Sequence, residues 1–232
     1  MLERLDRYEI AMIVQPLSPP LRRFGVPPGG PMDRQSWQHF AQEREVWELF
    51  GLATSRWKVL QDGWICHSGM PRQFIFEDQA VTPPFKVKAG KIIDVKTVIP
   101  GQVAYITLSD NPLSPVSPDP VREVCTLASI DELDQAELLS KPFTISIRSN
   151  RSGMRLAERV PGVPDLAQSE PCTAGVIQCT PSGEIIIVGP DGPTIGGYRR
   201  IGALVDTDTD KLARIGFNRG FRFVNAADGQ LR

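Results

Sequence analysis

The residues that could do chemistry lie in three glycine-rich segments far apart in the chain. The first, residues 25–34, reads GVPPGGPMDR, and its glycines and prolines predict a rigid turn that leads into a helix. Free N–H groups at a helix start suit a carboxylated ligand. Asp33 could orient or deprotonate an amide nitrogen, and Arg34 could bind an anion. Equally, Asp33 could only cap the helix while Arg34 stays in solvent.

The second segment, residues 149–156, reads SNRSGMRL and leaves a predicted strand. Asn150 and Arg151 place an amide and a planar fork of donors beside a glycine. Together they could hold a planar amide or a carboxylate. The alternative is that Asn150 forms an Asx turn and Arg151 makes a surface contact.

The third segment, residues 177–198, is a predicted strand, turn and strand, followed by the loop GPDGPTIGGY at 189–198. No Gly-Lys-Ser/Thr sequence follows, so a Walker-type nucleotide site is not supported. We expect the backbone amides and the Thr194 hydroxyl to line a cleft that Gly196 and Gly197 keep open. A plain turn without function is the alternative.

The elements that must position these segments are mostly short strands. Ten brief runs rich in β-branched or aromatic residues are bounded by Gly, Pro, Asp or Ser, which predicts an all-β fold of barrels or sandwiches. The runs are 11–14, 64–66, 73–76, 92–95, 103–108, 144–147, 176–178, 185–188, 203–205 and 221–224.

A few helices interrupt the strands. We expect a helix over residues 33–50, from an apolar stripe that includes Trp37, Phe40 and Trp47, with Gly51 as its stop. A capping box at 129–132 predicts a short helix through Leu139. A last helix after residues 208–209 ends at Gly216.

A proline-rich stretch divides the chain. Four prolines between residues 112 and 120 predict an extended linker. We therefore expect an N-terminal β-rich half at 1–110, a linker at 111–122 and a C-terminal barrel half at 123–232.

Composition excludes several classes of protein. Formal net charge is −1, from 26 basic and 27 acidic residues without a basic stripe, so nucleic acid is not an expected partner. No apolar run is long enough to cross a membrane, and the charged N-terminus is not a signal peptide, so a cytoplasmic location is expected. Four cysteines and two histidines match no zinc pattern. We expect reduced, half-buried cysteines and no metal.

Taken in order, the three segments resemble the carboxyltransferase-domain family that includes the C subunit of 5-oxoprolinase, allophanate hydrolase subunit 2 and KipA-like proteins. Its members carry Gly-Val-Pro-x-x-Gly-x-x-Asp-Arg, then Ser-Asn-Arg-x-Gly-x-Arg-Leu, then Ile-Gln-x-x-Pro-x-Gly and Asp-x-Gln-Thr-Thr-Gly-Gly-Tyr. The matching residues here are 25–34, 149–156, 177–183 and 191–198. The chain departs from this pattern at Pro193 and Ile195, which replace an amide and a hydroxyl.

The resemblance implies a cyclophilin-like double β-barrel that serves in an ATP-dependent amide-cleaving or biotin-dependent carboxyl-transfer complex. Its partner would be a subunit-B-like carboxyltransferase homologue, and its substrate a small polar amide. The site that the resemblance implies comprises Asp33 and Arg34 as catalytic residues, with Asn150, Arg151, Gln178, Thr194, Gly196, Gly197 and Tyr198 for binding.

The resemblance leaves two functions open. Because the chain has no biotin-attachment sequence and no nucleotide motif of its own, ATP or biotin would enter through a partner. The alternative function is a non-catalytic regulatory protein, like the antagonists of a kinase inhibitor, that keeps the subunit interface and has lost the chemistry.

Overall fold

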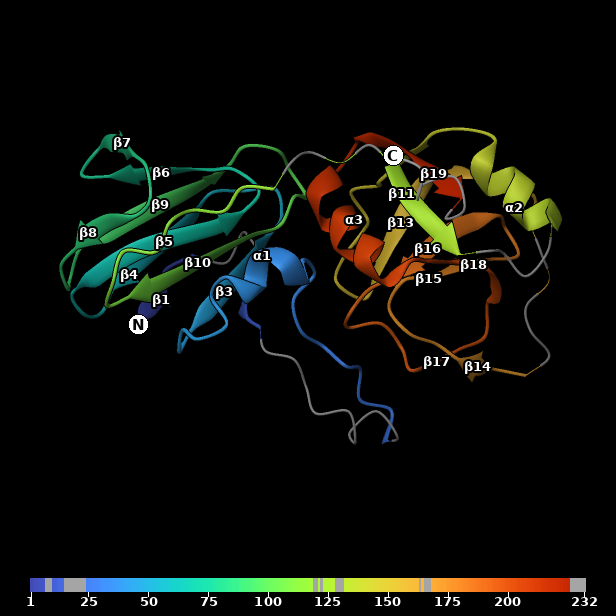
Figure 1. The fold of residues 1–232 in the computed structure, drawn as a ribbon, viewed down its shortest axis with the longest axis horizontal. Coiled ribbons are helices and arrows are strands. Elements are labelled where there is room, and N and C mark those ends of the chain that lie inside the picture. The colour runs from blue at the N-terminus through green and yellow to red at the C-terminus, as the bar shows by residue number, and fades with distance from the viewer. Residues whose placement is uncertain are drawn as a thin grey trace. The chain divides into compact units, whose positions relative to one another are not determined.

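The computed structural model in Figure 1 describes residues 1–6, 10–14, 24–118, 121, 123–127, 132–162, 164 and 168–225. The chain forms two compact units, one of residues 1–14 and 33–119 and the other of residues 15–32 and 120–232. Strands dominate both, with a few short helices, so the all-β prediction is confirmed. Among the described residues, no helix is long and apolar enough to cross a membrane.

The first unit contains two five-stranded antiparallel sheets. One has the order β1-β4-β9-β6-β7 and the other β2-β3-β10-β5-β8. The strands are β1 Leu2–Arg4, β2 Ile10–Ile13, β3 Val46–Phe50, β4 Ser55–Val59, β5 Gly63–Gly69, β6 Arg72–Phe76, β7 Gln79–Val81, β8 Phe85–Val87, β9 Ile92–Thr97 and β10 Ala104–Ser109.

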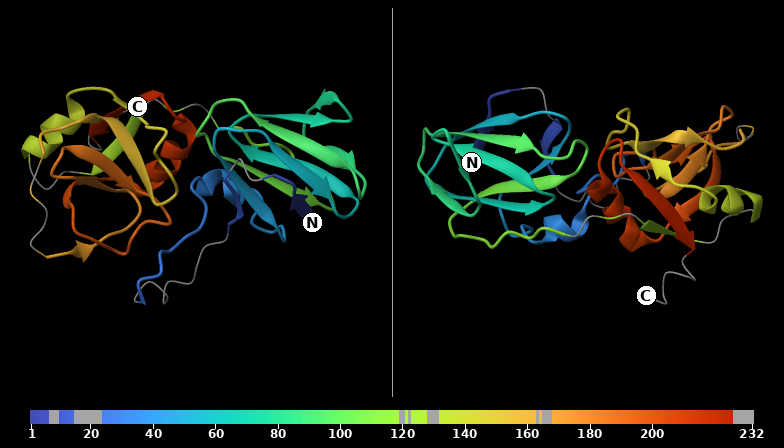
Figure 2. Two further views of the ribbon diagram at one scale, coloured as in Figure 1. Left: turned by 180° about the vertical axis from the view of Figure 1, so that it is seen from behind. Right: turned by 90° about the horizontal axis from the view of Figure 1, so that it is seen from above.

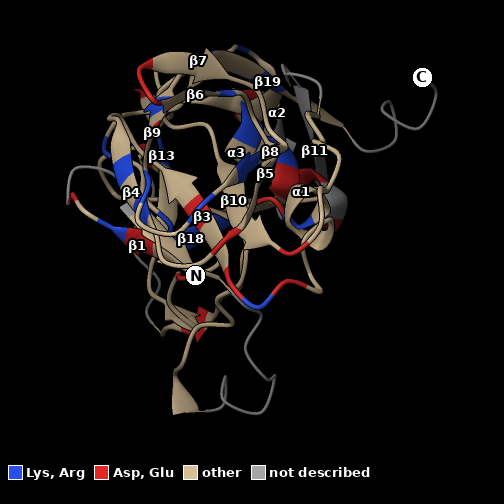
Figure 3. Cartoon of the chain, turned by 90° about the vertical axis from the view of Figure 1, so that its left-hand side faces the viewer, with Lys and Arg blue, Asp and Glu red and all other residues tan. Residues whose placement is uncertain are grey.

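One hydrophobic core holds these two sheets together. Buried side chains from both sheets join a single cluster, in which Trp57 and Ile106 come from opposite sheets. Strand β4 shows why: Trp57 and Val59 are buried while the alternate residues Arg56 and Lys58 are exposed. Acidic and basic residues are interspersed along the strands of this unit (Figure 3).

The second unit is built on a seven-stranded sheet of order β12-β19-β11-β18-β15-β16-β13. Its two end strands are linked by a bridge between Ile145 and Leu156, so the sheet closes on itself as a barrel (Figure 2). A two-stranded ribbon, β14–β17, accompanies it. The strands are β11 Glu123–Leu127, β12 Phe143–Thr144, β13 Gly153–Arg159, β14 Glu170–Pro171, β15 Val176–Cys179, β16 Glu184–Val188, β17 Ile195–Gly196, β18 Arg199–Leu204 and β19 Gly220–Asn225.

The helix predicted over residues 33–50 is wrong beyond its first turn. Helix α1 spans only Arg34–Gln38, and residues 46–50 form β3. Strand β3 pairs with β2 on one side and β10 on the other. These two ladders satisfy the backbone of β3 and override an apolar spacing that also fits a helix.

The other two helices agree better with the sequence. Helix α2 spans Glu132–Leu139, while residues 129–131 of the expected capping box lie outside the described residues. Helix α3 spans Thr209–Ile215 after a 3-10 turn at Asp206–Asp208, and it ends at Gly216 with a φ of 87°.

The predicted domains differ from the observed units at residues 15–32. The prediction placed them in the N-terminal half, whereas they belong to the second unit. The described part of this stretch is held there by the backbone N–H of Gly29, which donates to the carbonyl of Pro190 at 3.0 Å.

The sequence predicts reduced cysteines, and Cys66, Cys172 and Cys179 are in no disulfide bond in this structure. All three are buried rather than half-buried. Burial raises the pKa of the Cys66 thiol, so this cysteine stays protonated at neutral pH.

Candidate functional site

The described parts of the three polar segments meet within the second unit at Arg151. Its guanidinium donates from Nε to Asp191 Oδ2 at 2.7 Å and from Nη2 to Asp191 Oδ1 at 2.9 Å. The same Nη2 donates to the carbonyl of Gly30 at 2.7 Å. The buried side chain of Arg151 therefore joins Gly30 in the first segment to Asp191 in the third.

Glycines allow the backbones to approach closely at this junction. A Cβ at Gly189 would lie 2.1 Å from the carbonyl oxygen of Arg151. Gly29 and Gly30 have φ values of 61° and 88°, which disfavour residues with a side chain. The glycine-rich sequence of the first and third segments therefore follows from backbone geometry.

The side chains of Arg151 and Asn150 form hydrogen bonds with other residues of the second unit. Arg151 was predicted to bind substrate, and its planar fork is engaged by Asp191 and Gly30 in this structure. Asn150 Oδ1 accepts from the backbone N–H of Ser152 at 2.9 Å and of Gly153 at 3.2 Å. This is the Asx turn that the sequence offered as the alternative for Asn150. A direct role of either residue in binding stays a prediction.

Gln178 and Gly196 lie in direct contact. Gln178 is on β15 and is 6% exposed. A Cβ at Gly196 would come within 2.5 Å of its Nε2 atom. No hydrogen bond joins the Gln178 side chain to any residue in the described part of the chain, so its amide is largely buried without a protein partner there.

The rest of the predicted binding residues flank this contact along the chain. The carbonyl of Thr194 accepts from the backbone N–H of Cys172 at 2.8 Å, which attaches the loop to the β14 side of the ribbon. Gly197 and Tyr198 are exposed, Tyr198 to 41%. Four of the predicted residues, at positions 194 and 196–198, thus form one short segment over Gln178.

Asp33 and Arg34 belong to the first unit. Asp33 caps α1: its Oδ1 accepts from the backbone N–H of Ser36 at 3.2 Å and its Oδ2 from the Ser36 hydroxyl at 2.6 Å. This is the capping role that the sequence offered as the alternative. Arg34 is exposed on the same helix. Their expected meeting with the loops of the second unit stays a prediction.

A buried polar chain fixes the start of α1 within the first unit. The backbone N–H of Asp33 donates to the hydroxyl of Tyr105 at 2.9 Å, and that hydroxyl donates to Glu48 Oε2 at 2.8 Å. Burial raises the pKa of Tyr105 well above its usual value, so the phenol remains a donor. Asp33, Glu48 and Tyr105 are each at most 1% exposed.

Sequence reasoning missed Asp191, Tyr105 and Glu48. Asp191 lies in a Gly-Pro-Asp-Gly turn, which the sequence shows, but nothing in the sequence identifies Arg151 as its partner. Tyr105 and Glu48 carried no signal, since each lies in an ordinary strand pattern. Within the described residues, no group of three or more His, Cys, Asp or Glu side chains could hold a metal ion.

Comparison with a curated protein gives a partial match. The chain is 29% identical over 99 residues to the C subunit of 5-oxoprolinase from Escherichia coli strain K12, across 42% of this chain and 32% of that protein. The chain thus matches about one third of the relative's length.

Solved structures match almost the whole chain in fold. TTHA0988 (space group P212121) has a TM-score of 0.80 at 18% identity, covering 96% of this chain and 55% of that one. The K. lactis urea amidolyase has a TM-score of 0.73 at 16% identity, covering 97% and 19%. The Kluyveromyces lactis urea carboxylase gives 0.71 at 17%, covering 97% and 28%. At these identities the likeness shows the fold alone.

A protein family described as carboxyltransferase domain, subdomain A and B, matches residues 110–225. That range is half of the chain, and it contains Arg151, Gln178, Asp191 and the loop that ends at Tyr198. It also agrees with the fold of the urea carboxylase and with the 5-oxoprolinase relative. The chain therefore belongs to the carboxyltransferase-domain family, subdomain A and B.

Proposed function

We propose that this chain works within an amide-cleaving or carboxyl-transferring complex and binds a small polar amide beside Gln178. The relatives support this proposal by name, since they are one component of 5-oxoprolinase, a urea amidolyase and a urea carboxylase. Their named substrates, 5-oxoproline and urea, share a planar amide group. The proposed partner is a subunit-B-like carboxyltransferase homologue, in the cytoplasm.

The observation that carries the proposal is the largely buried, unpartnered amide of Gln178. The polar atoms of Gln178 are not among the fully buried, unsatisfied atoms of the described residues, so they keep some contact with solvent, and a ligand amide could replace that water. A carboxamide offers one acceptor and two donors, which complement the N–H and C=O groups of a substrate amide. The backbone of Gly196 packs directly on this amide, because even a Cβ there would lie 2.5 Å from Gln178 Nε2, so a ligand would have to reach the amide from another side.

The proposal assigns a role to each of the other predicted site residues. Thr194 and the backbone at Gly196 and Gly197 would line the amide site. Asp33 remains the proposed proton acceptor and Arg34 the proposed anion ligand. Because the Asp33 carboxylate already accepts two hydrogen bonds from Ser36, the experiment must separate the contribution of Asp33 from that of Gln178. ATP or biotin would reach the complex through the partner.

The test is co-purification with a subunit-B-like partner, followed by ATP-dependent turnover of 5-oxoproline and of urea. Gln178→Met keeps the side chain's length and removes its hydrogen bonds, so we expect KM to rise at least tenfold with an unchanged thermal melt. Asp33→Asn is tested alongside for a fall in kcat. Gln73→Met, at an exposed position on β6, is the matched control. Full turnover by Gln178→Met would refute the amide site.

A second candidate function is that of a non-catalytic regulatory protein. Ile195 favours it, because an apolar side chain that is 62% exposed stands where the family pattern has a hydroxyl. Pro193 likewise lacks the side-chain amide of that pattern. A stable complex with the partner that shows no turnover of either substrate would favour this function over the first.

A further inference from the structure

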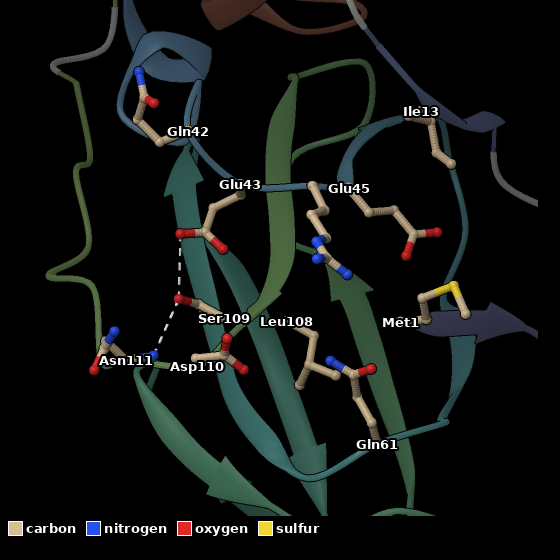
Figure 4. A pocket seen from close by; sticks show the side chains of 11 residues that line it. Met1, Ile13, Gln42, Glu43, Glu45, Gln61, Leu108, Ser109, Asp110 and Asn111 are labelled. Atoms are coloured by element: carbon tan, nitrogen blue, oxygen red, sulfur yellow. Dashed lines mark hydrogen bonds between the residues drawn. The ribbon is translucent and has the colours of Figure 1, made fainter.

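The first unit carries an open hollow that the candidate site does not use. It has a volume of about 660 Å³ and lies where the end of β10 meets the segment that leads into β3 (Figure 4). That volume is in the range of pockets for small ligands, about 300–1,000 Å³. Its lining residues are Met1, Ile13, Gln42, Glu43, Arg44, Glu45, Gln61, Leu108, Ser109, Asp110 and Asn111.

The hollow is lined by charges of both signs. Glu43, Glu45 and Asp110 supply three carboxylates and Arg44 supplies one guanidinium, so the lining side chains have a formal charge of −2. Within the described part of the chain, none of these four side chains forms an ion pair. They are therefore available to a ligand, and they differ from ordinary paired surface charges such as Arg56 and Asp94.

The carboxylates stand on opposite walls of the hollow. Figure 4 shows Glu43 and Asp110 on one side and Glu45 on the other, toward Ile13. The Glu43 wall is fixed, because the Ser109 hydroxyl donates to Glu43 Oε1 at 3.2 Å and accepts from the backbone N–H of Asn111 at 3.2 Å. The backbone at Glu45 is also fixed, since its carbonyl accepts from the hydroxyl of Thr107 at 2.7 Å.

The remaining lining suits the uncharged part of an organic molecule. Leu108, Ile13 and the side chain of Met1 offer apolar surface to a methylene chain. Gln42, Gln61 and Asn111 offer amides to polar groups between the charges. Arg44 disfavours a pure polycation, and the net negative charge disfavours a polyanion.

We propose that this hollow binds a small zwitterion with an additional positive charge, which is the chemistry of a basic amino acid or a short basic peptide. The two cationic groups would lie among Glu43, Glu45 and Asp110, and the carboxylate would pair with Arg44. A ligand with two positive charges and one negative charge matches the lining better than any singly charged ion. The proposal is independent of the amide site at Gln178.

The test is calorimetric titration of the full chain with L-lysine, L-arginine, the dipeptide lysyl-lysine, cadaverine and L-glutamate. We expect L-lysine to bind at least tenfold more tightly than cadaverine, which lacks the carboxylate, and than L-glutamate, which lacks the second cation. Tighter binding of lysyl-lysine than of lysine would identify the peptide as the better match to the volume.

Variants assign the contacts. Arg44→Gln should weaken the binding of L-lysine at least tenfold and leave the binding of cadaverine unchanged or tighter. Glu45→Gln should weaken the binding of both ligands. Lys86→Gln and Asp78→Asn, at exposed positions away from the hollow, are the matched controls, and a thermal melt checks that each variant is folded. The proposal is overturned if no zwitterion binds with a Kd of 10 mM or below, which corresponds to a binding free energy of roughly −2.7 kcal/mol. It is also overturned if cadaverine binds as tightly as L-lysine, or if Arg44→Gln leaves the binding of L-lysine unchanged. Turnover tested with the partner should not respond to Arg44→Gln.

Discussion

Acid should destabilise the first unit through His67. This side chain is 5% exposed on β5, and its Nε2 lies 3.1 Å from the carbonyl oxygen of Met70. Burial, aided by the positive charge of Arg72, lowers the pKa of His67 to about 4. The imidazole ring also packs edge-on against Phe74, with the two ring centroids 5.4 Å apart.

The sign of the effect follows from proton linkage. Between pH 6.5 and pH 4 the unfolded chain protonates this histidine while the folded chain keeps it neutral, so the free energy of unfolding falls as the pH falls. The pKa difference is about 2.5, and each pKa unit corresponds to about 1.4 kcal/mol. The loss of unfolding free energy is therefore at most about 3.5 kcal/mol. At pH 4.5 about 2.5 kcal/mol of it should be lost.

Urea denaturation followed by tryptophan fluorescence measures this loss. All four tryptophans, at positions 37, 47, 57 and 64, belong to the first unit, so the signal reports on that unit. Carboxylates also titrate in this range, and comparison with His67→Gln removes their contribution. The stability gap between the wild type and His67→Gln should therefore shift by about 2.5 kcal/mol between pH 7.5 and pH 4.5.

The other histidine of the chain provides the control. His39 is exposed, and its Nε2 lies 2.7 Å from the carbonyl oxygen of Ser114. His39→Gln, assayed in parallel, measures what the replacement of an exposed histidine by glutamine does to the same stability gap. A constant gap between the wild type and His67→Gln across this pH range would refute the reasoning, because it would mean that burial does not hold the imidazole neutral.

Three further substitutions test the packing and the polar contacts. Arg151→Ala removes the guanidinium that Asp191 accepts from, and should lower the thermal stability of the second unit by about 2–3 kcal/mol, measured by circular dichroism. Tyr105→Phe removes a hydrogen-bond donor from the buried Glu48 and should cost about 1–3 kcal/mol by urea denaturation. Phe74→Ala empties a fully buried site in the first core and should cost about 3–5 kcal/mol by the same assay.

Strands were predictable where short runs are rich in β-branched or aromatic residues. The runs at 73–76, 92–95 and 185–188 fall within β6, β9 and β16. In β9 the buried residues Ile93 and Val95 alternate with less buried ones, whereas residues 185–188 of β16 are all buried. Strand β4 was missed because its outward residues, Arg56 and Lys58, are charged and dilute the apolar signal. At 144–147 the strand ends early, and Ile147 is exposed.

The site could be predicted in part, for a physical reason. Glycines that permit positive φ and close approach are visible in a sequence, and these glycines mark the loops that meet at Arg151. The partner that an arginine selects depends on three-dimensional packing, so Asp191 was not assigned. The local alternatives for Asp33 and Asn150, a cap and an Asx turn, need only neighbouring residues, and both are present.

The path of the chain constrains how this protein can be dissected. The polypeptide passes between the units at residues 14–15, 32–33 and 119–120, so a cut near 119 alone leaves residues 24–32 of the second unit covalently attached to the first unit. A fragment beginning at 120 would also lack Gly29 and Gly30, and Arg151 would lose one of its acceptors. A shortened chain that joins residues 24–32 directly to residues 120–232 is therefore the better protein for studying the second unit in isolation.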